Sequence, residues 1–314
     1  MAEHFAQLSD PHLTSLESVQ ARDLINKRAL GYLSWRRRRR HEHSPQVLAA
    51  LQDDLASNAP GDQPLAQLLV TGDLTHIGLP DEFQQARTWL EGLGKPTDIA
   101  LVPGNHDACV SAPWDSTFAL WRPYMAADGD SGAAADPIEF PTLRVRGGIA
   151  FLGVSTGVPK APLMATGTAG AAQIKRLREL LLATKKQGLF RVVYLHHCPA
   201  RGREKWRKRL TDAALFQDML EVNGAELVVH GHGHRRHYTQ LSTRDGATPV
   251  IAVPSASALA LHGADMAQYN VFSVQRVDKG WKLDVNARVY EPASGAFLPA
   301  ESCSIELLRQ HADD

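Results

Sequence analysis

Five short segments rich in aspartate, histidine, asparagine and glycine occur along this 314-residue chain, and each follows an apolar, β-prone run. The segments are Asp10-Pro11-His12, Gly72-Asp73, Gly104-Asn105-His106-Asp107, His196 and Gly231-His232-Gly233-His234. In layered α/β proteins, ligands gather beyond the carboxyl ends of the strands, which is where such segments would meet. The pattern therefore predicts an α/β fold that brings distant polar side chains into one site.

Runs of β-branched and aliphatic residues predict strands, and helical patterns lie between them. The predicted strands are Phe5–Leu8, Leu68–Val70, Ile99–Val102, Ile149–Val154, Val192–Leu195, Leu227–Val229, Val250–Val253, Asn270–Val277 and Trp281–Val289. The predicted helices are Pro45–Asn58 behind a Ser44 cap, Glu82–Leu93 behind Asp81, Ala171–Gln187 ending at Gly188, and Asp212–Val222 behind Thr211. This alternation is typical of a layered α/β protein.

A single domain spanning residues 1–314 is expected, because the five segments run from residue 10 to residue 234 and any division between them would split the site. With 44% hydrophobic and 22% charged residues, the chain can bury a large core. Within this domain we expect a basic, lid-like insert at about residues 15–45.

The number of cysteines and the lengths of the apolar runs indicate where in the cell the protein is expected to lie. Cys109, Cys198 and Cys303 are an odd number in a long chain and do not form a disulfide framework, which favours a reducing compartment. Met1–Gln7 leads almost directly into a predicted strand and leaves no room for a secretory signal. No apolar run approaches the roughly 20 residues that span a bilayer. We therefore expect a soluble, cytoplasmic protein.

The residue types in the five segments are those that bind divalent transition ions, which prefer imidazole nitrogens and carboxylate oxygens. Asp10 and His12 are alternate residues at a strand end and can point to one side. The Asp73 carboxylate has two oxygens with which to bridge two ions, and Asn105 offers a neutral oxygen. Taken singly, Asp10 and Asp73 could also be ordinary turn residues, and His12 a surface histidine.

Three further histidines complete this set. His196 ends a predicted strand, where a lone histidine is more commonly a hydrogen-bonded core residue, and we expect the adjacent His197 to point elsewhere. His232 and His234 lie between glycines that are expected to let the backbone bend, with a solvated histidine tract as the alternative. The candidate metal ligands are Asp10, His12, Asp73, Asn105, His196, His232 and His234.

In this order, the segments resemble the D-x-H, G-D, G-N-H-D, H and G-H-x-H blocks of the calcineurin-like metallophosphoesterase superfamily. The resemblance covers roughly residues 4–240 and implies a four-layer α/β/β/α sandwich. It also implies two metal sites that share Asp73 as a bridge. The first would be formed by Asp10, His12, Asp73 and His234, and the second by Asp73, Asn105, His196 and His232.

The chemistry expected of such a centre is hydrolysis of a phosphoester. Two cations about 3.5–4 Å apart share a water, lower its pKa and hold a phosphoryl oxygen during in-line attack. We predict that His106 lies beside the metals and protonates the leaving oxygen or stabilises phosphoryl charge, while Asp107 orients its ring. Nitrogen and oxygen ligands of this kind favour Mn or Fe, with Zn, Co or Ni as alternatives.

Two strongly basic stretches stand out in a chain whose net charge is +0. Residues 15–45 hold eight arginines and lysines against three acidic residues, and residues 201–209 hold six against one. Both stretches follow a predicted metal-bearing strand, so they should lie at the rim of the site and attract polyanions; a solvated loop is the alternative. The candidate substrate contacts are Arg36, Arg37, Arg38, Arg203 and Arg207.

Apolar side chains are interleaved with these cations, which fits a lid that touches an amphiphilic substrate or a membrane surface. They are Leu30, Tyr32, Leu33, Trp35 and Trp206, and plain core contacts explain single members nearly as well. The stretch 26–33 followed by Arg36–Arg40 also resembles an insert in family members that hydrolyse UDP-diacylglucosamine. Peripheral contact at the inner face of the membrane is therefore a further expectation, whereas no nucleic acid partner is expected because no stacking platform accompanies the cations.

Three functions stay open from the sequence. The first is a phosphodiesterase or pyrophosphatase acting on a nucleotide, with cyclic nucleotides or UDP-diacylglucosamine as leading substrates. The second is a broad small-molecule phosphomonoesterase. The third is a metal-stabilised interaction protein without catalysis, which the complete set of ligand blocks disfavours. The sequence makes no prediction of the oligomeric state.

Overall fold

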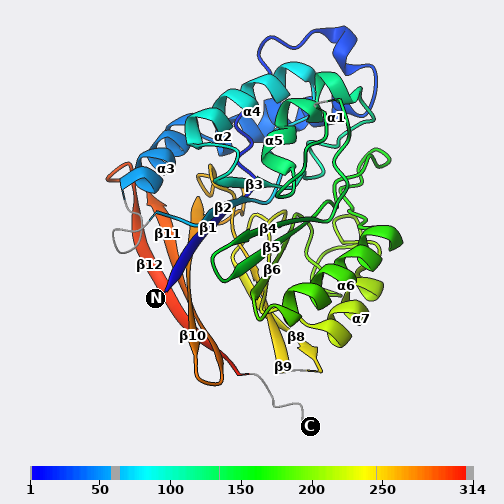
Figure 1. Ribbon diagram of the computed structural model, residues 1–314. Coiled ribbons are helices and arrows are strands. Elements are labelled where there is room, and N and C mark those ends of the chain that lie inside the picture. Colours follow the sequence, from blue (N-terminus) through cyan, green and yellow to red (C-terminus); the bar gives the residue numbers. More distant parts are fainter. Residues whose placement is uncertain (1, 58–63, 134, 245, 309–314) are drawn as a thin grey trace.

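The computed structural model describes residues 2–57, 64–133, 135–244 and 246–308, so Asn58, at the end of one predicted helix, lies outside the described residues. Within these ranges, two six-stranded mixed sheets pack face to face between helices on both outer sides (Figure 1). This is the four-layer α/β/β/α arrangement that the resemblance implied.

The first sheet has the strand order β12-β11-β10-β1-β2-β3. Its parallel part consists of β1 (Glu3–Leu8), β2 (Gln67–Val70) and β3 (Ile99–Leu101). Its antiparallel part consists of β10 (Gln268–Val277), β11 (Gly280–Glu291) and β12 (Ala296–Leu308).

The second sheet has the order β4-β5-β6-β7-β9-β8. Its parallel centre consists of β5 (Ile149–Val154), β6 (Phe190–Leu195), β7 (Leu227–His230) and β9 (Gly246–Ala252). Antiparallel strands close its edges, namely β4 (Thr142–Arg146) and β8 (His237–Thr243). In both sheets the carboxyl ends of the parallel strands therefore form one edge at which polar segments collect.

Helices cover the two outer faces (Figure 1). Those on the first sheet are α3 (Pro45–Ser57), α4 (Pro80–Leu93) and the short α5 (Arg122–Met125). Those on the second are α6 (Ala171–Lys186) and α7 (Ala213–Asn223). Between the sheets, the Phe5 ring stacks on Phe272 with centroids 4.7 Å apart and meets Phe151 edge-on at 5.2 Å, so the centre of the molecule is apolar and rigid.

Two of the predicted helix caps are wrong. Ser44 does cap α3, because its hydroxyl accepts the Val47 N–H at 3.5 Å. Helix α4, however, begins at Pro80 with Leu79 as N-cap, and not behind Asp81. Helix α7 has Asp212 as N-cap in place of Thr211, and the Asp212 carboxylate accepts backbone N–H groups from the segment before α6.

Elements that the sequence analysis missed include the short α5, three edge strands and the helices of the basic stretch. Strands β4, β8 and β12 are edge strands, and the exposed side chains of such strands do not form the apolar runs that identify buried strands. Residues 15–45 form η1 (Ala21–Leu24), α1 (Arg28–Ser34), the π-helix η2 (Trp35–Arg39) and α2 (Arg40–Glu42).

None of the helices formed by the described residues combines the length and hydrophobicity that crossing a membrane requires.

Candidate metal centre

The seven candidate ligands all lie at the carboxyl edge of the two sheets. They follow β1 (Asp10, His12), β2 (Asp73), β3 (Asn105), β6 (His196) and β7 (His232, His234). The two sheets thus bring together residues that are up to 224 positions apart in the chain.

Backbone strain is concentrated at these residues. In the described ranges, five of the seven non-glycine residues with positive φ are candidate ligands, with φ between 41° and 67°: Asp10, His12, Asp73, His232 and His234. A left-handed conformation costs a non-glycine residue about 1–3 kcal/mol and persists where the surrounding structure enforces it, commonly at functional sites.

The glycines beside His232 and His234 act differently from the prediction. The two histidines themselves take up the left-handed turn, and Gly231 does not have a positive φ. Gly231 provides space instead, since a Cβ there would lie 2.5 Å from Oδ2 of Asp10. The close approach of the β7 segment to the β1 segment therefore depends on glycine at this position.

One group of ligand atoms is spaced as a bound cation would require. His196 Nε2 lies 3.2 Å from Asp73 Oδ2, 3.2 Å from Asn105 Oδ1 and 3.2 Å from His232 Nδ1. Two atoms that each lie about 2.1 Å from one ion, at octahedral or tetrahedral angles, are roughly 3.0–3.4 Å apart. The three distances from His196 Nε2 therefore match those between ligand atoms of one divalent ion.

A second group approaches the same Asp73 oxygen, Oδ2, and not the other oxygen as the sequence analysis expected, because Oδ1 accepts the His106 N–H. Asp10 Oδ1 is 3.2 Å from His234 Nε2 and 4.0 Å from His12 Nε2, which is itself 4.0 Å from Asp73 Oδ2. Asp10 Oδ1 and His12 Nε2 are buried, and neither finds a hydrogen-bond partner within the described part of the chain. Burying a polar atom without a hydrogen-bond partner costs free energy. A cation between Asp10 Oδ1 and His12 Nε2 would give both atoms a partner.

Hydrogen bonds from backbone groups fix these side chains. The Nδ1–H groups of His12 and His196 donate to the carbonyls of Thr75 and Thr71, at 3.0 and 2.7 Å, which leaves each Nε2 as a lone pair for an ion. Asp10 Oδ2 accepts the His232 N–H at 2.9 Å, so Oδ1 is the free oxygen.

The protonation states suit metal binding at most of these groups. Burial alone would raise the pKa of Asp73, but the adjacent His196 and His106 hold it well below its usual range. Burial lowers the pKa of His12 far below its ordinary value, which keeps its ring neutral. His196 is the exception, because Asp73 outweighs burial and raises its pKa to about 9. Metal binding must therefore release a proton from this histidine.

Asp107 does not orient the His106 ring as the sequence analysis expected. Its carboxylate accepts hydrogen bonds from the N–H groups of Asp73 (2.8 Å), Gly104 (2.9 Å) and Thr75 (3.0 Å), and from the Thr75 hydroxyl (3.0 Å). Asp107 thus ties the β2 and β3 segments together. Adjacency in sequence misled the prediction, since the turn points the two side chains in different directions.

The His106 ring is held by two other groups. Its Nδ1 lies 2.6 Å from the His76 carbonyl oxygen and 2.9 Å from Nη1 of Arg39, and its backbone N–H donates to Asp73 Oδ1 at 2.7 Å. Burial, reinforced by the Arg39 guanidinium, lowers the pKa of His106 to about 3. The ring of the free protein is neutral near pH 7, so protonation of a leaving oxygen requires that the negative charge of a bound substrate raise this pKa. The contact made by Nδ1 decides whether the neutral Nε2 donates or accepts a hydrogen bond.

Comparison with known proteins agrees with this geometry. Residues 3–236 match the family described as calcineurin-like phosphoesterase. The chain belongs to this family. It is accordingly a metal-dependent phosphoesterase with His and Asp clusters suited to a two-metal centre.

Solved structures that resemble this chain do so at low sequence identity. A dimetal phosphatase from Danio rerio is 10% identical with a TM-score of 0.61, and the match covers 98% of this chain and 99% of that one. A 5′-nucleotidase precursor from Thermus thermophilus is 14% identical with a TM-score of 0.47, and this phosphoesterase spans about half of it (98% and 55% covered). Vps29 from Chaetomium thermophilum is 11% identical with a TM-score of 0.41 and 98% coverage of both chains. No curated protein matches the chain.

A cavity of about 770 Å³ opens over the centre of this phosphoesterase. Asp73, Asn105, His106, His232 and His234 line its floor. Cations outnumber acids in its walls among the described residues: Glu42 and Glu204 stand against Arg38, Arg39, Arg203, Lys205, Lys208, Arg235 and Arg236.

The predicted substrate arginines divide into two groups. Arg38 and Arg203 line the cavity, whereas Arg36, Arg37 and Arg207 are exposed and are not among its lining residues. Arg207 lies over the Trp206 ring at 5.0 Å instead. Helical geometry explains why Arg38 lines the cavity and Arg36 and Arg37 do not, since consecutive residues of η2 point to different sides.

The two tryptophans among the interleaved apolar residues differ in exposure. Trp35 is buried and packs with Leu16, Ile77 and Leu79, so the core-contact alternative holds for it. Trp206 is 61% exposed and remains available to a ligand. Trp35 therefore anchors the arginine run and does not form part of an apolar lid.

Functional residues that the sequence analysis missed come from the same insert. Arg39 reaches His106, and His43 faces His12, with ring centroids 4.5 Å apart. The run of five arginines was visible in the sequence, but five identical residues give no indication of which one turns inward. His197, which we expected to point elsewhere, lies near His232 but uses Nδ1 for Thr156 and Nε2 for the Ala165 carbonyl.

Replacing Arg39 with methionine is expected to lower kcat about 10- to 100-fold on a substrate with a poor leaving group. Losing a charge-assisted hydrogen bond of about 1.5–3 kcal/mol gives this range. Because Arg39 contacts His106, an aryl ester whose leaving group needs no proton should be affected much less. Steady-state kinetics on both substrates tests this, with the exposed neighbour Arg40→Met as control. Equal losses on the two substrates would contradict a role through His106.

Proposed function

We propose that this phosphoesterase hydrolyses a phosphodiester or pyrophosphate bond in a nucleotide-type substrate. The cavity carries the proposal, because its cationic walls extend well beyond the ligand atoms and suit a substrate with more negative charge than one phosphate supplies. A small phosphomonoester would leave most of these cations unused.

We assign one metal ion to each of the two groups of ligand atoms described above. One ion is held by Asp10, His12, Asp73 and His234, and the other by Asp73, Asn105, His196 and His232. When bound, such ions lower the pKa of a shared water and neutralise phosphoryl charge. Ligands of nitrogen and oxygen suit Mn or Fe, and also Zn, Co or Ni.

Residues that do not bind the ions complete the chemistry. His106 lines the cavity, where it stabilises phosphoryl charge or protonates the leaving oxygen. Arg39 orients its ring, and the cationic wall that includes Arg38 and Arg203 binds the remaining phosphate groups. Asp107 acts as a positioning residue that holds the turn carrying His106.

Exposed apolar side chains near the cavity extend the proposal to a lipid-linked substrate. On α1, Leu30 and Leu33 are 45% and 42% exposed, and the adjacent Ser34 lines the cavity. Trp206 lies beside the lining residue Lys205. This arrangement suits the acyl chains of a molecule like UDP-diacylglucosamine and peripheral contact with the inner face of a membrane.

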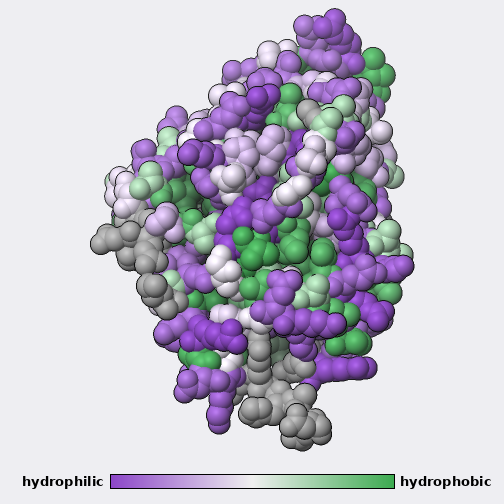
Figure 2. Space-filling view, in the orientation of Figure 1, coloured by the Kyte–Doolittle hydropathy of each residue, from purple (hydrophilic) through white to green (hydrophobic). Residues whose placement is uncertain are grey.

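The projecting end of the molecule supports a headgroup contact more than deep insertion. Figure 2 shows mainly hydrophilic residues there, where Figure 1 places the dark blue segment of the insert. The exposed Arg36 and Arg37 belong to this insert, and cations of this kind attract anionic headgroups.

A substrate panel in the presence of Mn²⁺ tests the proposed function. We expect the largest kcat/KM for a UDP-linked diacyl sugar or for a cyclic nucleotide, and a smaller value for p-nitrophenyl phosphate. The opposite order would favour the broad phosphomonoesterase. No turnover with any ester, together with unchanged folding after ligand replacement, would favour the interaction protein.

Replacing both Arg38 and Arg203 with alanine is expected to raise KM about 10- to 100-fold for a nucleotide diphosphate ester, since each lost phosphate contact removes a charge-assisted hydrogen bond. KM for a small aryl phosphate should change less than about threefold. The matched control is Arg36→Ala with Arg37→Ala, which lie in the same run but outside the cavity lining. Equal KM changes in the two double variants would contradict the assignment.

A further inference from the structure

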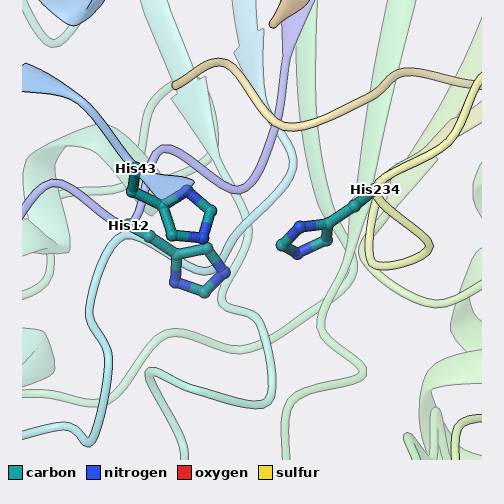
Figure 3. A group of neighbouring side chains, drawn as sticks. All are labelled: His12, His43 and His234. Atoms are coloured by element: carbon teal, nitrogen blue, oxygen red, sulfur yellow. The ribbon is translucent and has the colours of Figure 1, made fainter. Parts of the chain in front are cut away.

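A third histidine, His43, lies beside the candidate ligand His12, and His234 points toward both rings from the opposite side (Figure 3). His43 follows α2 at the end of the arginine-rich insert, and its side chain is more than nine-tenths buried. One nitrogen from each of the three rings lies within 4.8 Å of the other two. The centroid of the His43 ring is 4.5 Å from that of His12 and 5.7 Å from that of His234.

A chain of hydroxyl groups engages one nitrogen of His43. Its Nδ1 lies 2.8 Å from Ser257 Oγ, which lies 3.3 Å from Ser255 Oγ. The Ser255 hydroxyl donates to the Asp10 carbonyl at 2.7 Å, so its oxygen is left to accept from Ser257. Ser255 Oγ also lies 3.4 Å from His43 Nδ1 and accepts the Ser257 N–H at 3.3 Å. In the tautomer with the proton on Nδ1, Ser257 accepts that N–H and Nε2 is left as a lone pair.

Backbone contacts hold His43 in this position. The Ser44 N–H donates to the Ser257 carbonyl at 3.0 Å, and His43 forms an isolated β-bridge with Ala258. The Leu259 N–H donates to the Glu42 carbonyl at 2.9 Å. These contacts therefore attach the end of the insert to the segment after β9 and hold the backbone of His43 in place.

We propose that His43 Nε2 is an additional ligand of the ion held by Asp10, His12 and His234. The inference rests on the proposed metal centre and adds a residue from the insert to it. This ion then has three imidazoles, whereas the other has the two of His196 and His232. A nitrogen-rich site discriminates in favour of Co²⁺, Ni²⁺ or Zn²⁺ over Mn²⁺, so the two positions differ in metal preference.

Two substitutions separate ligation from packing. In His43→Asn, the amide nitrogen takes the place of Nδ1 beside Ser257, but nothing replaces Nε2. In His43→Gln, the longer side chain offers an oxygen near the position of Nε2. The matched control is His41→Ala, an exposed histidine two residues earlier in the same segment.

Calorimetric titration of the metal-free full chain with Co²⁺, followed by visible absorption, provides a readout independent of turnover. We expect His43→Asn to weaken one of two Co²⁺ sites about 10- to 100-fold and to alter the ligand-field bands, with a smaller loss for Mn²⁺. His43→Gln should retain part of the affinity, and His41→Ala all of it.

Three results would overturn the inference. Wild-type Co²⁺ affinities and spectra in His43→Asn would remove His43 from the metal. Equal losses in the Asn and Gln variants, with a lower Tm of the metal-free protein, would assign it a packing role. Fewer than two Co²⁺ ions in the wild-type protein would refute the proposed centre itself.

Discussion

Replacing Asp73 with alanine is expected to remove both metal ions and to lower turnover at least about 1,000-fold. The carboxylate belongs to both groups of ligand atoms, since Oδ2 is 3.2 Å from His196 Nε2 and 4.0 Å from His12 Nε2. Its other oxygen accepts the backbone N–H of His106 at 2.7 Å. A two-metal centre contributes several kcal/mol to transition-state stabilisation, and each 1.36 kcal/mol corresponds to a factor of ten.

Elemental analysis after dialysis, together with kcat measurement, checks this expectation. Asp81→Asn is the control, because Asp81 is an exposed aspartate in the first turn of α4, away from the ligand groups. The Tm of the metal-free variant shows whether the chain still folds. Two tightly bound ions in a folded Asp73→Ala protein would refute the bridging role.

The parts of the site that the sequence predicted are those tied to regular structure. Asp10, Asp73 and His196 stand just after buried parallel strands, whose apolar runs are visible in the sequence, and parallel strands end at a common edge. The left-handed backbone of Asp10 and Asp73 could not be predicted, because aspartate only tolerates this conformation better than most residues and the assembled turn enforces it.

The parts that the sequence could not predict depend on packing between distant segments. Trp35 is buried against Leu16 and Ile77, and this contact sets the rotation of η2 that turns Arg39 toward His106. His43 reaches the centre because Ser257, more than 200 residues later, holds its ring. Periodicity describes one element at a time and carries no information about either contact.

Replacing His106 with alanine is expected to slow turnover about 100- to 10,000-fold on a substrate with a poor leaving group, while both metal ions stay bound. The side chain lines the cavity, and Nδ1 is engaged by the His76 carbonyl and by Arg39, so Nε2 is the nitrogen left for the substrate. Since no ligand atom is removed, metal content should equal that of the wild-type protein.

Comparing substrates with good and poor leaving groups distinguishes loss of proton donation by His106 from a general structural effect of the substitution. An ester of p-nitrophenol leaves without a proton, so its hydrolysis by His106→Ala should fall far less than that of an alkyl or nucleoside ester. His41→Ala, which alters an exposed histidine of the insert, is the control for surface histidine loss. A loss of equal size for both leaving groups would remove proton donation from the role of His106 and leave charge stabilisation. Unchanged turnover on the poor leaving group would remove His106 from the reaction altogether, and the cationic wall would then carry the phosphoryl contact alone.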